Sequence, residues 1–186
     1  MHRRDLLRAF GAATALALVP EDAIAAWTRL AAGERPSREL GRTQLELIGA
    51  IADTLLPRTD SPSATDVHVP AFVELILADN FSDVDRAAFT AGLGLIDDAA
   101  KRIGNADFVA LSPETREQVV ASIESGDRRS EPGRTYWRLK DLIIHGYFTS
   151  EPVMKTVLRV EVMPGRFDGD VLMPARAAAA GAQRND

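Results

Sequence analysis

The sequence of 186 residues predicts an all-α protein, a small irregular bundle of about five or six helices with a C-terminal segment that wraps over it. Three observations support this fold class. Apolar residues recur at spacings of three and four along most of the chain, and typical helix start and stop residues flank these stretches. No segment between turn signals alternates apolar and polar residues as a half-buried strand would. The length allows one domain rather than two.

The first expected helix begins at Thr43, where Thr43-Gln44-Leu45-Glu46 fits a capping box. An apolar stripe runs from there to Leu55-Leu56, and Pro57 ends it because proline cannot continue a helix. The preceding residues, 26–42, contain several Gly and Pro residues. We expect them to form a linker with at most one turn of helix.

The remaining helices are predicted by the same kind of signals: Ser or Pro at the start and Gly at the end. A turn-rich loop at 58–69 and a charged loop at 127–133 separate them. The helical domain is expected to cover 43–174, followed by a disordered tail at 175–186. The further helices are expected to begin at Pro70, after Ser82, at Ser112-Pro113 and at Thr135, and the last three to end at Gly104, Gly126 and Tyr147.

The first 25 residues resemble a twin-arginine signal peptide. Arg3-Arg4 and Leu6-Leu7 precede a short apolar run, and the small-residue site Ala23-Ile24-Ala25 follows it. The run is too short to cross a bilayer, which takes about twenty residues. We therefore expect export in the folded state to the periplasm, with cleavage at the site formed by Ala23 and Ala25.

Composition limits the chemistry of the chain. With no cysteine, it cannot form a disulfide, a thiolate zinc site or a covalent c-type haem link. Its formal net charge of −5, without a basic stripe, predicts no nucleic-acid partner. Gly92 and Gly94 lie within a helical pattern and are expected to allow close helix packing rather than to bind a dinucleotide.

Groups that could serve acid–base catalysis are scattered along the chain. Neither His68 nor His145 has a second histidine three or four residues away, as a helical metal site would require. We expect no catalytic residue, no metal site and no cofactor in this chain. One alternative is a stand-alone periplasmic hydrolase or lyase that uses Asp60, His68 and His145, and another is a stand-alone assembly or binding factor. The full set of scattered candidates is Asp60, Asp66, His68, Asp141, His145 and Glu151.

Three segments, in this order, resemble the gluconate 2-dehydrogenase subunit 3 family. The first runs from Leu55 through Thr59-Asp60-Ser61-Pro62 to Val73, and the second is Leu139–Leu142 with His145–Glu151. The third is the closing turn Pro164–Gly169. In the family a Cys often follows this turn, but Asp170 stands here, so a covalent tie to a partner at that point is excluded.

The resemblance implies an accessory role. Family members resemble small gamma subunits of sugar and polyol dehydrogenases, whose catalytic subunit is an FAD-containing flavoprotein of the glucose–methanol–choline type. A multihaem cytochrome c is often the third member. The resemblance thus implies that the small subunit supports folding, stability and twin-arginine export of the catalytic subunit, and that FAD belongs to the partner.

Two stretches are expected to contact that partner: the loop at 57–70 and the turn at 145–151. Tyr147 and Phe148 follow Gly146 at an expected helix end, where their own bundle encloses a side chain less easily. Tyr136 and Trp137 could fill the core or serve an interface, since interfaces are enriched in aromatic residues. The predicted contact residues are Pro57, Thr59, Asp60, Pro62, Pro70, His145, Tyr147, Phe148 and Ser150.

Overall fold

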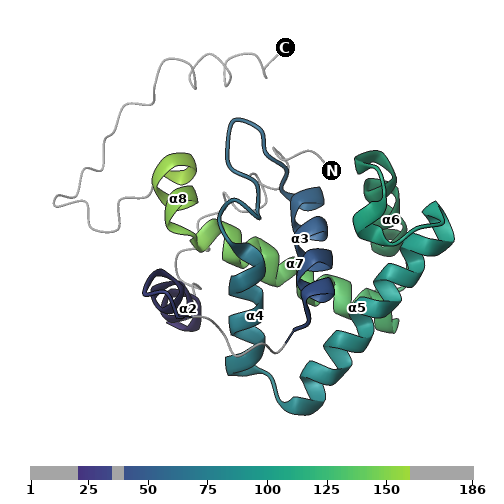
Figure 1. Ribbon diagram of the computed structural model, residues 1–186, viewed down its shortest axis with the longest axis horizontal. Helices are drawn as coiled ribbons and strands as arrows, with labels where there is room; N and C mark the ends of the chain where they lie inside the picture. Colours follow the sequence, from purple (N-terminus) through teal and green to yellow (C-terminus); the bar gives the residue numbers. More distant parts are fainter. Residues whose placement is uncertain (1–20, 35–39, 160–186) are drawn as a thin grey trace, which may run out of the picture.

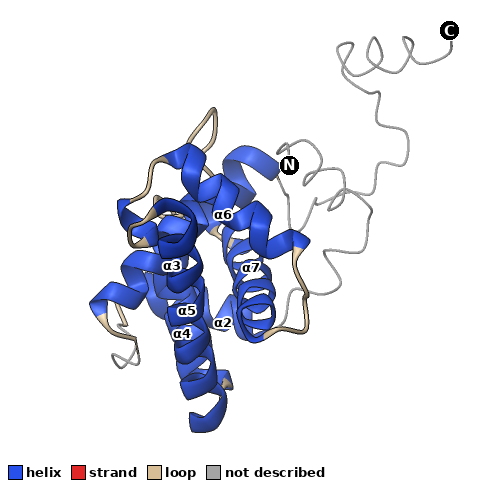
Figure 2. Cartoon of the chain, turned by 90° about the vertical axis from the view of Figure 1, so that its right-hand side faces the viewer, coloured by secondary structure: helices blue, strands red, loops and turns tan. Residues whose placement is uncertain are grey.

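The computed structural model describes residues 21–34 and 40–159, and this part of the chain is a bundle of seven α-helices without a β-strand (Figures 1 and 2). The all-α prediction is confirmed, with slightly more helices than the five or six expected. The elements in chain order are α2 (Glu21–Ala31), α3 (Arg42–Leu55), α4 (Val69–Asn80), α5 (Asp83–Gly104), the 3₁₀ turn η2 (Phe108–Ala110), α6 (Pro113–Ser125), α7 (Glu131–Thr149), α8 (Glu151–Val153) and the π-helical turn η3 (Met154–Leu158).

Helix α7 is the centre of the bundle. It contacts each of the other six described α-helices, and Figure 1 shows it crossing α3 and α4. Its buried stripe consists of Tyr136, Leu139, Ile143 and Tyr147, each at most 1% exposed. These residues are spaced by three and four, so they lie on one helix face. Burying a side chain of this size stabilises a fold by about 1.5–3 kcal/mol, so this stripe of α7 contributes strongly to core packing.

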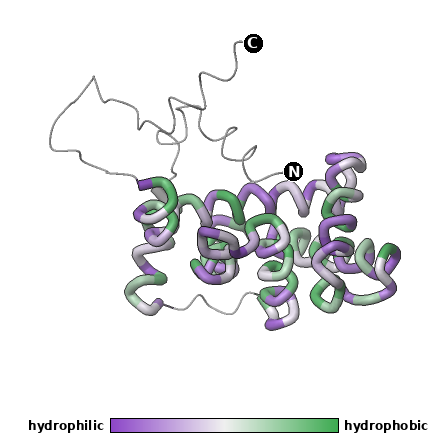
Figure 3. Tube along the Cα trace, turned by 90° about the horizontal axis from the view of Figure 1, so that it is seen from above, coloured by the Kyte–Doolittle hydropathy of each residue, from purple (hydrophilic) through white to green (hydrophobic). Residues whose placement is uncertain are grey.

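Helices α3, α5 and α6 bury one face against this centre, whereas α4 is buried on all sides from Phe72 to Leu77. Figure 3 shows hydrophobic and hydrophilic residues alternating along the helical turns. Glycines allow two close crossings against α7 and its neighbours. A Cβ at Gly92 of α5 would overlap the Thr135 side chain of α7, and a Cβ at Gly146 would lie 2.6 Å from Cδ1 of Phe72 in α4. The prediction of close packing at Gly92 is confirmed, whereas a Cβ at Gly94 would meet open space.

The predicted starts of α5 and α6 are confirmed, the predicted start at Thr43 is wrong, and α4 begins at Val69, one residue before the predicted Pro70. Ser82 and Ser112 cap α5 and α6, because their hydroxyl oxygens accept the backbone N–H of the third residue beyond, at 3.2 and 3.3 Å. Helix α3, in contrast, begins at Arg42 and not at Thr43. The extended Gly41 is its cap, and the Gly41 N–H donates to the Gln44 side chain at 2.5 Å. Glu46 is not part of a cap, since it forms an ion pair with Arg42 at 2.8 Å.

Helix α7 begins four residues before the predicted Thr135. Ser130 is its cap, with the Gly133 N–H donating to the Ser130 hydroxyl oxygen at 3.2 Å. The last part of the expected loop at 127–133 is therefore helical. Gly104 is the last residue of α5 rather than its left-handed terminator, and Asn105 takes that conformation with φ of 56°.

The expected linker at 26–42 also differs from the structure. Residues 26–31 belong to α2, a helix of 11 residues that begins at Glu21. Ala26 is 2% exposed, so this stretch is part of the core and not a linker that leads to it. Several predicted features lie outside the described residues: the signal residues Arg3, Arg4, Leu6 and Leu7, the closing turn, and the tail at 175–186. None of the described helices combines the length and apolar character needed to span a membrane.

Candidate functional site

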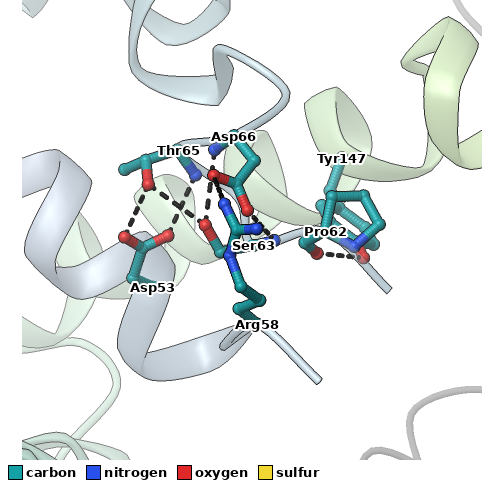
Figure 4. A network of polar contacts seen from close by, with 7 residues as sticks. All are labelled: Asp53, Arg58, Pro62, Ser63, Thr65, Asp66 and Tyr147. Atoms are coloured by element: carbon teal, nitrogen blue, oxygen red, sulfur yellow. Dashed lines mark hydrogen bonds and ion pairs between the residues drawn. The ribbon is translucent and has the colours of Figure 1, made fainter. Parts of the chain in front are cut away.

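The loop at residues 56–68, here called the α3–α4 loop, carries four of the predicted contact residues and is held by a network of polar contacts (Figure 4). Asp53, near the end of α3, anchors its second half. The Asp53 carboxylate accepts a hydrogen bond from the Thr65 backbone N–H at 2.9 Å and another from the Thr65 hydroxyl at 2.6 Å. The Ala64 N–H donates to the Leu56 carbonyl at 3.1 Å, so the loop folds back onto the end of its own helix.

Ser63 and Asp66 form a reciprocal pair within the loop. The Ser63 N–H donates to the Asp66 carboxylate at 2.8 Å, and the Asp66 N–H donates to the Ser63 hydroxyl oxygen at 3.3 Å. Arg58 adds an ion pair to the same carboxylate. The Ser63 backbone N–H, with help from the Ser63 hydroxyl and Arg58, lowers the pKa of Asp66 below its ordinary value. The carboxylate therefore stays charged and holds the turn at neutral pH.

Tyr147 of α7 holds the middle of the loop by a hydrogen bond to Pro62. Its hydroxyl donates to the Pro62 carbonyl at 2.8 Å and lies 3.3 Å from the Ser61 hydroxyl oxygen (Figure 4). Tyr147 is 1% exposed and Ser61 is 8% exposed. The polar groups of the loop are thus used to fix its shape, and the arrangement is suited to presenting a rigid surface.

The predicted contact residues fall into three groups. Pro57, Thr59 and Asp60 are exposed on the first half of the loop. Four are half-buried and two, Tyr147 and Ser150, are buried. The expectation that Tyr147 escapes its own bundle is wrong, because α7 continues to Thr149 and keeps Tyr147 on the same buried stripe as Ile143. The half-buried residues are Pro62, Pro70, His145 and Phe148.

The scattered acid–base candidates occupy different parts of the fold. His68 is exposed before α4 in a left-handed conformation, with φ of 59°, and His145 is half-buried within α7. In the described ranges, no hydrogen bond or ion pair joins either imidazole to a carboxylate. Asp141 is exposed on α7, and Glu151 forms an ion pair with Lys155. Of this set, Asp66 belongs to the network of the α3–α4 loop shown in Figure 4, and Asp60 accepts a hydrogen bond of 2.8 Å from the Thr59 hydroxyl in the same loop.

Two further features complete the description of the candidate sites. Within residues 21–34 and 40–159, no three His, Asp or Glu side chains gather as a metal site would require. A cavity of about 280 Å³ lies between α3, α5 and η2. Two of its carboxylates, Asp97 and Asp107, are already paired with Lys101 at 3.0 and 3.1 Å. The lining residues are Thr43, Gln44, Glu46, Leu47, Thr90, Leu93, Gly94, Asp97, Asp107 and Val109, none of them a predicted contact residue.

The residues that build the loop are not among those predicted from the sequence as contact residues, except Pro62 and Tyr147. Ser63-Ala64-Thr65-Asp66 fits the pattern of a Ser followed three residues later by an acid, which could have identified the reciprocal pair. The contact of Asp53 with Thr65 carries no such signal, since it depends on how the loop folds back. Trp27, which packs α2 against the core, lies in the stretch that the sequence predicts to be a linker.

Comparison with known proteins gives one match. A family model described as gluconate 2-dehydrogenase subunit 3 matches residues 42–165, which is more than half of the chain. The matched region begins at the first residue of α3 and includes the α3–α4 loop and α7. No curated protein and no solved structure matches the chain.

Proposed function

Because the chain belongs to the gluconate 2-dehydrogenase subunit 3 family, we propose that it is the non-catalytic small subunit of an FAD-dependent sugar or polyol dehydrogenase. The catalytic partner in this proposal is a flavoprotein of the glucose–methanol–choline type, and a multihaem cytochrome c is a further member of the complex. The family name, which denotes one subunit of a dehydrogenase, supports an accessory role. The absence of cysteine supports it as well, since a covalent haem must then belong to another chain.

The single observation that carries the proposal is the family match over residues 42–165, and the construction of the α3–α4 loop indicates where the partner binds. The polar groups of the loop bond to one another and to Tyr147, while Pro57, Thr59 and Asp60 remain exposed. A loop that is already fixed in shape loses little conformational entropy when it binds, which favours association. We therefore assign the direct contacts with the flavoprotein to these three exposed residues. Tyr147 supports the surface from inside the bundle, and the buried Ser150 hydroxyl donates to the Tyr147 carbonyl at 2.7 Å.

The sequence of the first 25 residues supports a role of this chain in export as well. A flavoprotein folds around FAD in the cytoplasm and then needs a route for folded cargo. The paired Arg3-Arg4 and the apolar run behind them are typical of a twin-arginine signal. The small subunit would thus support folding of the catalytic subunit and carry it to the periplasm.

Purification from the native cell tests the proposal. The full chain with an affinity tag should retain one large protein that contains flavin, and the eluate should reduce a dye in the presence of a sugar or polyol. The isolated chain, released from that complex, should contain no flavin and show no turnover. An eluate without any flavoprotein, or turnover by the isolated chain, would contradict the assignment.

A further inference from the structure

Helix α2 carries the small-residue site Ala23-Ile24-Ala25, and it is the one described helix that lies outside the matched region 42–165. Family membership therefore does not account for its packing. All three residues of the site are in helical conformation. Ala23 is 3% exposed and belongs to the hydrophobic core, whereas Ile24 is 60% exposed.

The residues that follow the site fix α2 to two other helices. Ala26 is 2% exposed. The Trp27 ring stacks on Phe72 of α4 with 5.1 Å between ring centroids, and its Nε1 donates a hydrogen bond of 2.9 Å to the Thr149 hydroxyl of α7. Arg29 adds an ion pair with Asp79 of α4. These contacts begin one residue beyond Ala25.

Cleavage of a peptide bond requires that the chain around it leave its secondary structure and enter the protease. Exposed, unstructured segments are therefore cut readily, and structured segments are cut only when they open. In this fold, opening the site means separating Ala23 from the core and straining the adjacent Trp27 contact. The rate of cleavage then follows the fraction of molecules in which α2 is open.

We propose that docking of α2 onto α4 and α7 closes the site at Ala23–Ala25 to signal peptidase, so that processing requires α2 to detach. This inference rests on the proposed function, because only a chain that is exported in the folded state meets the peptidase with α2 already docked. Detachment of α2, and not recognition of the small residues, then limits processing. The folded domain itself controls whether its leader is removed.

The chain offers a matched pair of variants for the test. Trp27→Ala removes the stack on Phe72 and the hydrogen bond to Thr149. Trp137→Ala makes the same chemical change on α7, where the ring lies beside Arg128 and Lys140 instead of α2. A smaller change, Thr149→Val, removes only the acceptor of the Trp27 hydrogen bond in a side chain of similar shape, and it serves if Trp27→Ala fails to fold.

The experiment incubates each purified full chain with signal peptidase in detergent micelles and follows the intact mass over time. A synthetic peptide of residues 1–32 provides the open reference and should be cut after Ala25. Wild type and Trp137→Ala should be cut at least about tenfold more slowly than Trp27→Ala, which corresponds to a shift of one decade in the open fraction. Thr149→Val should be cut about threefold faster than wild type, as expected for one lost hydrogen bond.

Several outcomes would overturn the inference. The first is an equal cleavage rate for wild type and Trp27→Ala, or for wild type and Thr149→Val if Trp27→Ala does not fold. The second is that Trp137→Ala accelerates cleavage as much as Trp27→Ala does. The third is that the enzyme leaves the synthetic peptide intact. Hydrogen exchange of residues 21–31 in wild type checks the closed state directly, and protection comparable to that of α3 is expected. The assay needs neither the flavoprotein nor export, so its failure is distinguishable from failure of the proposed function.

Discussion

The Tyr147 hydroxyl donates a hydrogen bond of 2.8 Å to the carbonyl oxygen of Pro62 and so joins the central helix to a surface loop 85 positions away in the sequence. Tyr147 lies on the buried stripe of α7, and Pro62 lies in the α3–α4 loop. The conformation of the exposed residues Pro57, Thr59 and Asp60 is thereby coupled to the packing of the core. The surface that we propose for the partner is therefore fixed in shape before binding.

Removal of this hydroxyl should destabilise the fold. Tyr147→Phe keeps the ring but removes the hydrogen bond to the part-buried Pro62 carbonyl, and a hydrogen bond of this kind contributes about 0.5–1.5 kcal/mol. Tyr147→Ala also opens a cavity and should cost about 3–5 kcal/mol, the range for large aromatic side chains. Urea unfolding followed by circular dichroism measures both. An unchanged midpoint for Tyr147→Phe would show that the hydrogen bond does not support the loop.

Two glycines of α5, two positions apart, should respond to alanine in opposite directions. A Cβ at Gly92 would overlap Thr135, so Gly92→Ala forces the α5–α7 crossing apart and should cost about 1–3 kcal/mol. Gly94→Ala meets open space and should stabilise the helix by about 0.4–1 kcal/mol. Thermal melts of the two variants provide this comparison, and a loss of stability at Gly94 would contradict the packing described.

Acid should remove the contribution of the Asp66 carboxylate. The Ser63 backbone N–H is the main cause that lowers the pKa of Asp66 from its ordinary value of 3.8. A carboxyl whose pKa is depressed in the folded state stabilises the fold above its unfolded pKa, and this contribution disappears as the pH falls through the folded pKa. The difference in unfolding free energy between wild type and Asp66→Asn should therefore be full at pH 7 and shrink below pH of about 4. A difference that stays constant down to about pH 2 would exclude this role.

Local signals in the sequence predict the end of a helix correctly where the residues at that end determine it. Ser82 and Ser112 with Pro113 identify the starts of α5 and α6, because capping needs only a side-chain oxygen and a nearby backbone N–H. The start of α7 carried a similar signal in Ser130 and Pro132, but Gly133 inside the first turn favoured a loop. The Ser130 cap, which accepts the Gly133 N–H, outweighs this preference for a loop.

Features that depend on distant contacts could not be predicted in this way. The burial of Tyr147 follows from where α7 ends and from the return of the α3–α4 loop over its hydroxyl. The docking of α2 depends on Trp27 meeting Phe72 and Thr149, which are far from it in the sequence. The signal-peptide pattern identifies Ala23-Ile24-Ala25 of this helix as a cleavage site, and it contains no information about a folded helix at the same position.

Export should depend on the chemical identity of the paired arginines. Changing Arg3-Arg4 to Lys-Lys preserves the charge, but lysine lacks the planar guanidinium and is not equivalent where that group is recognised. The variant should remain in the cytoplasm, together with the flavoprotein proposed as its partner. Cell fractionation and immunoblotting measure the distribution. Normal amounts of the Lys-Lys variant in the periplasm would disprove the twin-arginine assignment.

The most direct test of the central claim is the amount of flavin that co-purifies with variants of the α3–α4 loop. Asp60→Lys reverses a charge on the exposed part of the loop, and Glu117→Lys makes the same reversal at an exposed position of α6. If the loop contacts the flavoprotein as a hot spot, Asp60→Lys should reduce bound flavin by at least about tenfold while Glu117→Lys retains it. Equal flavin recovery with wild type and both variants would contradict the assignment of this loop as the partner-binding surface.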